Sequence, residues 1–338
     1  MSSKTCLLLV SALSAVPLLA QTPREFPQWP PAEPVTIQAI PGVIDAGARW
    51  TQVWQGDATA DGIVGYKGGL LFAQEQTNRI GRLDKNGKFS VFLSTPHGPG
   101  AIAIGAQGEI FTVERSCTDP GGHLGVKPEQ CTEPTDVAVL TPKRKVLADS
   151  VNGKSLGRVN DLVVNKRGDI YFTSGEVFHL SPGGQVTAIG ENIRPNGIML
   201  SPDEKTLYVT NRAVIVAFDI QPDGSVKNQR DFARLEAGGT GDGMIVDAAG
   251  RLYVTSPAPH LGIQVFSPEG KYLGIIPTPR SAISVSFSGP GKKTLYAACM
   301  GAMGADGKEF RTPPGVRNVA MTIYTIPMLA QGFPGRPK

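Results

Sequence analysis

Four residues with side-chain oxygen atoms, Asp61, Asn160, Asn196 and Asp242, stand at the same point of a repeated pattern. Each precedes by 11 or 12 residues an aromatic residue in a strand-like run such as LYVT. Asp and Asn are depleted in β-strands, so their recurrence indicates a chemical role. Carboxylate and carboxamide oxygens are ligands of hard divalent cations, and facing carboxylates repel one another without such a cation. We therefore expect the four residues to bind a divalent metal ion.

The composition of this set also indicates which ion it prefers. Oxygen ligands with two negative charges suit Ca²⁺ first and Mg²⁺ or Mn²⁺ next. Zn²⁺ matches less well, because it normally takes His or Cys ligands and neither stands at these positions. A structural alternative stays open, since Asp61-Gly62, Asn196-Gly197 and Asp242-Gly243 are dipeptides typical of tight turns.

The elements that must position these residues are short strands in a long repeat. The aromatic residue recurs six times, with spacings of 39, 60, 37, 45 and 43 residues, as Phe72, Phe111, Tyr171, Tyr208, Tyr253 and Tyr296. A strand-based period near 40 is typical of a β-propeller, with one four-stranded blade per repeat. The sequence thus predicts an all-β, six-bladed propeller. Its inner strands line one central channel, where the four oxygen-bearing side chains would meet.

Both ends of the chain contribute to this prediction. Strand-like runs at 35–40 and 48–54, together with 319–326, predict a blade built from both termini, so that the propeller spans 35–326. Residues 327–338 read as an exposed tail.

The first 34 residues predict export. Residues 1–20 have the pattern of a secretory signal, with Lys4 ahead of an apolar stretch too short to span a bilayer, and 21–34 are polar and rich in proline. We therefore expect no membrane span and a periplasmic or extracellular location. In that setting Cys117 and Cys131, which bracket a glycine-rich loop, are expected to form a disulfide. Metal binding by this pair is the alternative.

The charge pattern argues against one class of partner. The 338 residues carry a formal net charge of only +4, and the basic residues are scattered rather than clustered with aromatic residues. Nucleic-acid binding is therefore not expected. We expect a monomer that binds a small molecule.

Three segments resemble a known family: RVNDLVVNKRGDIYFTSGE, RPNGIMLSPDEKTLYVTN and GDGMIVDAAGRLYVTS. They are similar to the senescence-marker-protein/gluconolactonase (regucalcin-like) family, and the resemblance extends over about 61–298. It implies a six-bladed propeller with a divalent cation, and lactone-opening activity. It also implies metal ligation by Asn196 and Asp242, a ligand or substrate contact at Asn160, and substrate binding by Arg158. The first-blade ligand of the family is usually Glu, and Asp61 is one methylene shorter.

Loops at the same face as the four residues are expected to form the rim of the site. In an antiparallel blade, the start of the first strand and the connection between the second and third strands lie at one face. Glu176 and His260 stand in two such connections and are candidates for polar contacts with substrate. An exposed position without function is the alternative for each.

These observations predict a metal-dependent hydrolase that opens a sugar lactone or a related ester. The metal would polarise the carbonyl and activate a water molecule, Asp242 would be the base, and Arg158 would neutralise developing charge. Two alternatives stay open. One is a propeller that binds sugar or protein without catalysis, and the other is a phosphotriesterase or esterase of the same fold.

Overall fold

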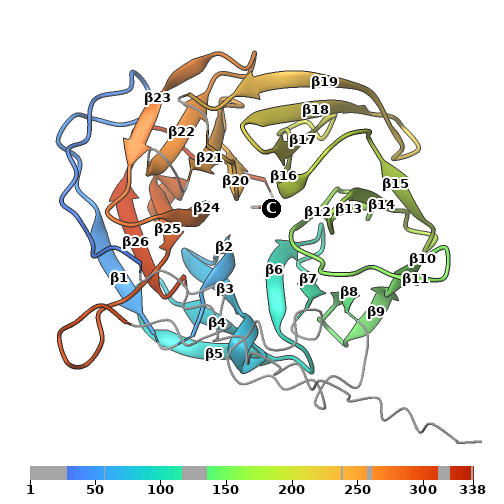
Figure 1. The fold of residues 1–338 in the computed structure, drawn as a ribbon, viewed down its shortest axis with the longest axis horizontal. Coiled ribbons are helices and arrows are strands. Elements are labelled where there is room, and N and C mark those ends of the chain that lie inside the picture. Colours follow the sequence, from blue (N-terminus) through green and yellow to red (C-terminus); the bar gives the residue numbers. More distant parts are fainter. Residues whose placement is uncertain are drawn as a thin grey trace, which may run out of the picture.

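Six four-stranded antiparallel sheets form a closed ring in the computed structural model (Figure 1). The structure describes residues 29–56, 58–115, 135–236, 239–256, 261–310, 320–335 and 338. Each sheet is one blade, and one of its two edge strands lies closest to the axis of the ring. The predicted six-bladed propeller is therefore confirmed. Because the ring closes on itself, the sheets are arranged without a gap between the first and the last blade.

Five of the blades are built from four consecutive strands each, and a two-stranded hairpin stands between blades two and three. Blade one contains β2 (Asp61–Tyr66), β3 (Gly69–Gln74), β4 (Arg79–Leu83) and β5 (Phe89–Ser94). Blade two contains β6 (Pro99–Ile104), β7 (Ile110–Glu114), β8 (Asp136–Val139) and β9 (Lys145–Ala148). The hairpin consists of β10 (Ser150–Val151) and β11 (Lys154–Ser155).

The second half of the ring follows the same order. Blade three contains β12 (Leu162–Val164), β13 (Ile170–Thr173), β14 (Val177–Leu180) and β15 (Val186–Ile189). Blade four contains β16 (Pro195–Leu200), β17 (Thr206–Asn211), β18 (Val214–Ile220) and β19 (Val226–Arg234). Blade five contains β20 (Met244–Val246), β21 (Leu252–Ser256), β22 (Gly262–Phe266) and β23 (Tyr272–Pro277).

The sixth blade joins the two ends of the chain. It combines β24 (Ala282–Ser288), β25 (Thr294–Cys299) and β26 (Thr322–Pro327) with β1 (Thr51–Gln55). Thr51 lies opposite Thr325 in the pairing of β1 with β26. The predicted closure by both termini is thus confirmed.

One of the predicted N-terminal strands does not form. Residues 35–40 lie outside the sheets and make only an isolated bridge from Ile40 to Ile44. Pro34 and the Pro41-Gly42 turn bound this segment, and a proline cannot donate a hydrogen bond to a neighbouring strand. Its apolar residues are still buried, Ile37 and Ile40 among them, so the segment packs on the ring through side chains.

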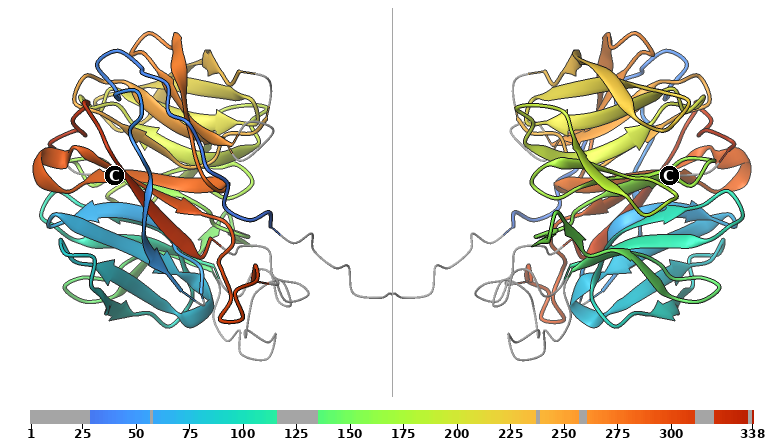
Figure 2. Two further views of the ribbon diagram at one scale, coloured as in Figure 1. Left: turned by 90° about the vertical axis from the view of Figure 1, so that its left-hand side faces the viewer. Right: turned by 90° about the vertical axis from the view of Figure 1, so that its right-hand side faces the viewer.

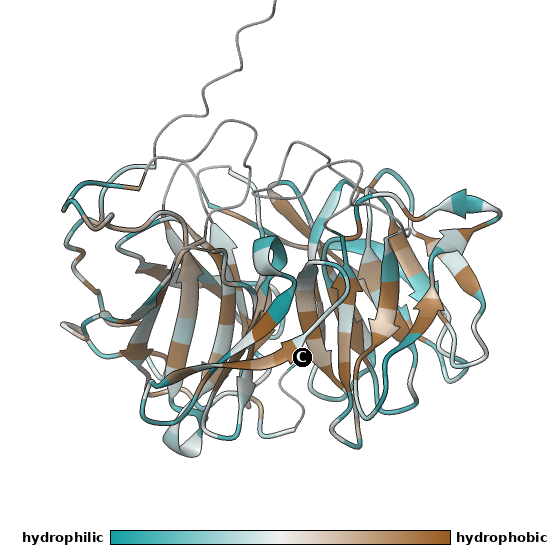
Figure 3. Cartoon of the chain, turned by 90° about the horizontal axis from the view of Figure 1, so that it is seen from below, coloured by the Kyte–Doolittle hydropathy of each residue, from teal (hydrophilic) through white to brown (hydrophobic). Residues whose placement is uncertain are grey.

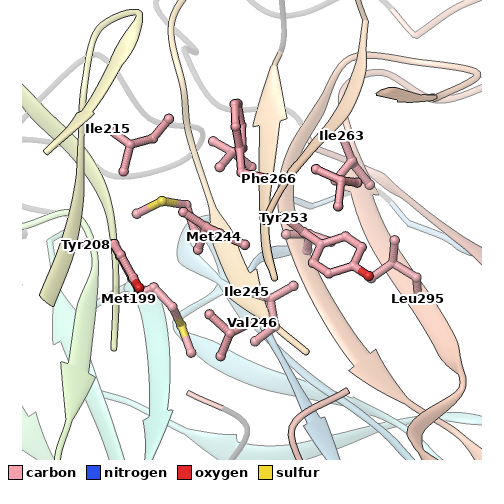
Figure 4. Packing of buried hydrophobic residues seen from close by; sticks show 14 of the residues in the cluster. Met199, Tyr208, Ile215, Met244, Ile245, Val246, Tyr253, Ile263, Phe266 and Leu295 are labelled. Carbon is pink, nitrogen blue, oxygen red and sulfur yellow. The ribbon is translucent and has the colours of Figure 1, made fainter. Parts of the chain in front are cut away.

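Apolar side chains are concentrated in the strands and polar ones in the turns between them (Figure 3). The largest buried cluster joins blades four, five and six, where Met199, Met244 and Tyr253 pack against the neighbouring sheets (Figure 4). Tyr253 is one of the repeated aromatic residues, and its ring meets that of Phe287 edge to face at 5.1 Å. Tyr253 thus packs between blades five and six, and Phe72 in blade one likewise meets the ring of Trp54 in β1 at 4.9 Å.

The tail beyond 327 is not an exposed extension, contrary to the prediction. Met328 and Ala330 are buried, and Gly332 bridges to Asp247 at the end of β20. Lys338 is also buried, and the C-terminal end of the chain lies on the axis of the ring (Figure 1). In the edge-on views this end lies within the depth of the disc (Figure 2). Apolar residues and backbone hydrogen bonds hold the tail against the ring.

Several predictions concern parts of the chain that the structure does not describe. The signal segment 1–20, Cys117, Cys131 and His260 all lie outside the described residues. In the described ranges, no helix combines the length and the apolar character needed to cross a bilayer.

Closure of the ring generates a prediction about stability. Ile323 in β26 is completely buried between β1 and β25. Replacing Ile323 with Ala should lower the free energy of unfolding by about 2–5 kcal/mol, because the cavity would lie in the sheet that joins both ends of the chain. Chemical denaturation measures the change.

The matched control is Val91→Ala, at a strand position that is 48% exposed. This control should change the free energy of unfolding by no more than about 0.5 kcal/mol. Equal effects of the two substitutions would contradict the role assigned to the closing blade.

Candidate active site in the central channel

The four oxygen-bearing residues converge on the axis, each from a different blade. Asp61 begins β2 and Asn196 is the second residue of β16, whereas Asn160 and Asp242 stand just before β12 and β20. Three of them, all but Asn196, line a cavity of about 20 Å³ in the channel. That volume holds one water molecule or a small cation.

The glycines that follow these residues have a packing role. A Cβ on Gly197 would overlap the carbonyl oxygen of Asp242, and one on Gly62 would overlap the backbone of Ala101. The inner strands of neighbouring blades therefore approach too closely for any side chain at these positions. This accounts for the glycine of each dipeptide but not for the acidic or amide residue before it.

A buried arginine occupies the centre of this polar group. The guanidinium of Arg115, which is 2% exposed, lies 2.8 Å from Oδ2 of Asp61 and 3.0 Å from Oε2 of Glu75. Its Nη1 also donates to Oδ1 of Asn160 at 2.8 Å. Burial alone would lower the pKa of Arg115, but the adjacent carboxylates of Glu75 and Asp61 raise it overall. Arg115 is thus a permanent positive charge in the channel.

The hydrogen bonds continue from Arg115 across the channel. Because Oδ1 of Asn160 accepts from Arg115, its amide group points the other way and Nδ2 donates to Oδ1 of Asn196 at 2.6 Å. The side chain of Asn196 in turn hydrogen-bonds Asp242. A single chain of polar contacts therefore joins Asp61 in blade one to Asp242 in blade five.

The surroundings of Asp242 disfavour a negatively charged carboxylate. The residue as a whole is partly exposed to solvent, although its carboxyl group is densely surrounded by protein atoms. Burial, followed by the negative charges of Asp61 and Asp161, raises the pKa of Asp242 to about 8. In the described part of the chain, no ion pair neutralises this carboxyl group. Asp242 therefore favours a proton or an added cation beside it.

A second internal cation enters the channel from the tail. Nζ of Lys338 lies 2.5 and 2.6 Å from the two carboxylate oxygens of Asp161, and both side chains are more than nine-tenths buried. The backbone oxygen of Lys338 accepts a hydrogen bond from the amide of Ile104 at 3.2 Å. Lys338 also lines the 20 Å³ cavity beside Asp61 and Asp242. Lys338 thus neutralises the carboxylate of Asp161 and occupies part of the channel beside the four oxygen-bearing residues.

The remaining candidates lie at the rim. Nη1 of Arg158 is 3.5 Å from Oε1 of Glu75, and the Arg158 side chain is 30% exposed, so it can reach a ligand in the channel mouth. Glu176 is exposed in the connection between β13 and β14. The structure brings Arg158 to the polar group through Glu75 and leaves Glu176 on the surface of the rim.

Sequence reasoning missed Glu75, Arg115 and Lys338. Glu75 and Arg115 each directly follow the second strand of a blade, β3 and β7, and both strands end at the face where the channel residues begin. Charged residues at that equivalent position were the available signal. Nothing in the local sequence around Lys338 indicated that it would enter the channel.

The residues present fit a divalent cation. Within the described ranges, no three His, Cys, Asp or Glu side chains are grouped to bind a metal, so a site in this channel needs other oxygen ligands, such as carboxamides, besides its carboxylates. Asn196 and Asp242 supply a carboxamide and a carboxylate, and Asp61 adds a carboxylate that Arg115 partly neutralises. Oxygen donors of this kind suit Ca²⁺ or Mg²⁺. The unpaired charge of Asp242 is the feature that a cation would satisfy.

The Arg115 network leads to a prediction about folding stability. Arg115→Met leaves the fully buried Glu75 with less compensation for its charge and should cost about 3–5 kcal/mol of unfolding free energy. The double variant Arg115→Met/Glu75→Gln should recover part of this loss, because the buried charge is removed together with its partner. Denaturation of the three proteins measures both steps, and a double variant less stable than the single one would contradict the pairing.

Comparison with known proteins agrees with this architecture. Residues 58–300 match the profile of the family described as SMP-30/Gluconolactonase/LRE-like region. A gluconolactonase from Zymomonas mobilis is 30% identical over 270 residues, which cover 70% of this chain and 75% of that protein. A pentonolactonase from Haloferax volcanii is 26% identical over 190 residues, which cover 52% of this chain and 65% of that protein.

A solved structure has the same fold. The gluconolactonase from Xanthomonas campestris superposes with a TM-score of 0.67 at 22% identity, covering 90% of this chain and 99% of that one. The calcium-binding protein regucalcin from Agrobacterium tumefaciens superposes with a TM-score of 0.61 at 15% identity, covering 81% and 92%. The family profile spans most of the propeller, and the Zymomonas relative reaches 30% identity over three quarters of its own length. This chain therefore belongs to the SMP-30/gluconolactonase/LRE-like family.

Proposed function

We propose that this protein is a lactonase that hydrolyses a sugar lactone or a related cyclic ester with the help of a divalent cation. The relatives named for gluconolactone and pentonolactone hydrolysis support this reaction class. The observation that carries the proposal is Asp242, a carboxyl group without an ion-pair partner in the described chain, which lies beside Asn196 and lines the small cavity of the channel. Such a group can hold a metal and accept a proton.

Asn196 and Asp242 would hold the cation, and Asp61 would contribute its carboxylate. Ca²⁺ is the first choice for these oxygen donors, and the calcium-binding relative supports it. When bound, the cation would polarise the lactone carbonyl and lower the pKa of a coordinated water molecule.

The side chains of this protein would carry the rest of the reaction. Asp242 accepts a proton from the attacking water as the oxygen of that water bonds to the lactone carbonyl carbon. The ring C–O bond then breaks, and the proton passes to the departing ring oxygen, which becomes a hydroxyl group. The product is the open-chain hydroxy acid, so water is the only co-reactant.

Arg158 and Arg115 have separate roles in this scheme. Arg158 is partly exposed and lies beside Glu75, so it is suited to bind substrate oxygens and to stabilise developing negative charge. Arg115 is buried and holds Asp61 and Asn160 in place. Arg158 is therefore the proposed substrate contact, and Arg115 is the residue that positions the ligands.

The proposal predicts a specific loss of activity. Asp242→Asn should reduce turnover of aldonolactones by about 100-fold or more, because the amide cannot act as the base, while the neutral side chain preserves the fold. Hydrolysis of gluconolactone and a pentonolactone, followed by acid release after chelation and addition of Ca²⁺, Mg²⁺, Mn²⁺ or Zn²⁺, measures this effect. Asp45→Asn, an exposed substitution outside the channel, is the matched control and should retain full activity.

The same experiment separates lactonase activity from the two alternatives. A protein that uses the metal only to stabilise the channel would gain thermal stability with the ion, by about 2.7 kcal/mol at 100 times Kd, but would open no lactone. A phosphotriesterase or esterase would turn over those substrates and leave the lactones intact. Either result would overturn the proposal.

A further inference from the structure

We propose that three arginines on blade four form an anion-binding pocket beside the channel, and that the substrate is a small lactone with a terminal phosphate or carboxylate group. This inference rests on the proposed function and assigns the substrate class. The pocket is lined by Arg194, Arg212 and Arg234 and has a volume of about 560 Å³. Pockets of this size commonly bind small molecules.

The three arginines reach the pocket from three separate elements. Arg194 directly precedes β16, Arg212 lies in the tight turn between β17 and β18, and Arg234 is the last residue of β19. Residues far apart in sequence therefore place three positive charges around one hollow. Such charges repel one another unless an anion lies between them.

The described structure provides no internal anion for these arginines. None of the three forms an ion pair with a described acidic residue, whereas Arg230 on the same blade pairs with Asp219 at 2.7 Å. Guanidinium groups bind phosphate and carboxylate through paired hydrogen bonds. Their exposure leaves them available to a ligand from solution.

The backbone around the pocket is held by its own hydrogen bonds. The amide of Arg194 donates to Oδ1 of Asn211 at 3.0 Å, and Nδ2 of Asn211 donates to the carbonyl of Asn192 at 3.5 Å. Arg234 pairs with Val214 across β18 and β19. The three arginines therefore project from a well-defined scaffold rather than from one isolated loop.

The pocket adjoins both proposed metal ligands. Arg194 stands two residues before Asn196, a backbone span of at most about 7 Å. The carbonyl of Arg212 accepts a hydrogen bond from the amide of Gly241 at 2.8 Å, and Gly241 directly precedes Asp242. The arginines therefore lie close along the backbone to Asn196 and Asp242, and we infer that the far end of a lactone bound at those two residues reaches them. Selection for an anion at that end would distinguish this substrate from a neutral aldonolactone.

The test compares three lactones with the same ring: one neutral, one with a terminal phosphate and one with a terminal carboxylate. In the unmodified enzyme, at least one charged lactone should have a KM about tenfold or more below that of the neutral lactone. The triple variant R194Q/R212Q/R234Q should raise that KM by about tenfold or more and leave the neutral lactone within about twofold. The two charged substrates show whether phosphate or carboxylate is the preferred group.

A direct binding measurement keeps the inference testable without turnover. Inorganic sulfate, titrated calorimetrically, should bind the unmodified protein and bind the triple variant at least tenfold more weakly. The matched control removes three exposed lysines elsewhere on the ring, K154Q/K166Q/K271Q, and should bind sulfate as the unmodified protein does.

Each outcome has one meaning. Unchanged sulfate binding in the arginine variant, or equal weakening in the lysine control, would overturn the pocket. Sulfate binding at the arginines with no preference for charged lactones would overturn the substrate class. If no lactone is hydrolysed, the proposed function fails, while the sulfate titration still decides whether the anion pocket exists.

Discussion

The buried contact between Arg115 and its carboxylates determines how this channel can function. One guanidinium pairs with both Asp61 and Glu75 and orients Asn160, whose amide then faces Asn196. Charges so far from bulk solvent are costly unless each has a partner, so the orientation of one side chain sets that of the next. The charge that remains is concentrated on Asp242, at the opposite side of the channel. The charge balance of the channel thus leaves one carboxyl group, that of Asp242, without an ion-pair partner among the described residues.

The propeller was predictable because residues of the same type recur at equivalent positions of its repeats. The aromatic residue of the second strand recurs in every blade, and Tyr253 and Phe72 each pack against a ring of the neighbouring blade. Asp61, Asn196 and Asp242 were likewise recognisable, since equivalent positions of a ring must meet on its axis. The periodicity of the sequence was therefore sufficient to predict both the fold and these three channel residues.

The features that the sequence did not predict lie outside the repeated pattern. Arg115 comes from blade two alone, and its role in the channel depends on its pairing with the carboxylates of Asp61 and Glu75. Lys338 comes from a tail whose composition resembles an exposed segment, yet Met328 and the bridge at Gly332 hold that tail to the ring. Residues 35–40 have a strand-like pattern but lie between prolines, so they pack without joining a sheet. Arg115 and Lys338 thus depend on contacts that no local pattern encodes, whereas the flanking prolines were a local signal against a strand at 35–40.

The pairing of β1 with β26 has a consequence for the order of folding. Thr51 and Thr325 are 274 residues apart, and closing so long a loop in a flexible chain costs about 5 kcal/mol of entropy by simple polymer theory. During synthesis β1 is made before all other strands, and it stays unpaired until the five other blades and its partner β26 have been made. High contact order of this kind slows folding. The pairing of β1 with β26 can therefore form only after the rest of the ring has been synthesised.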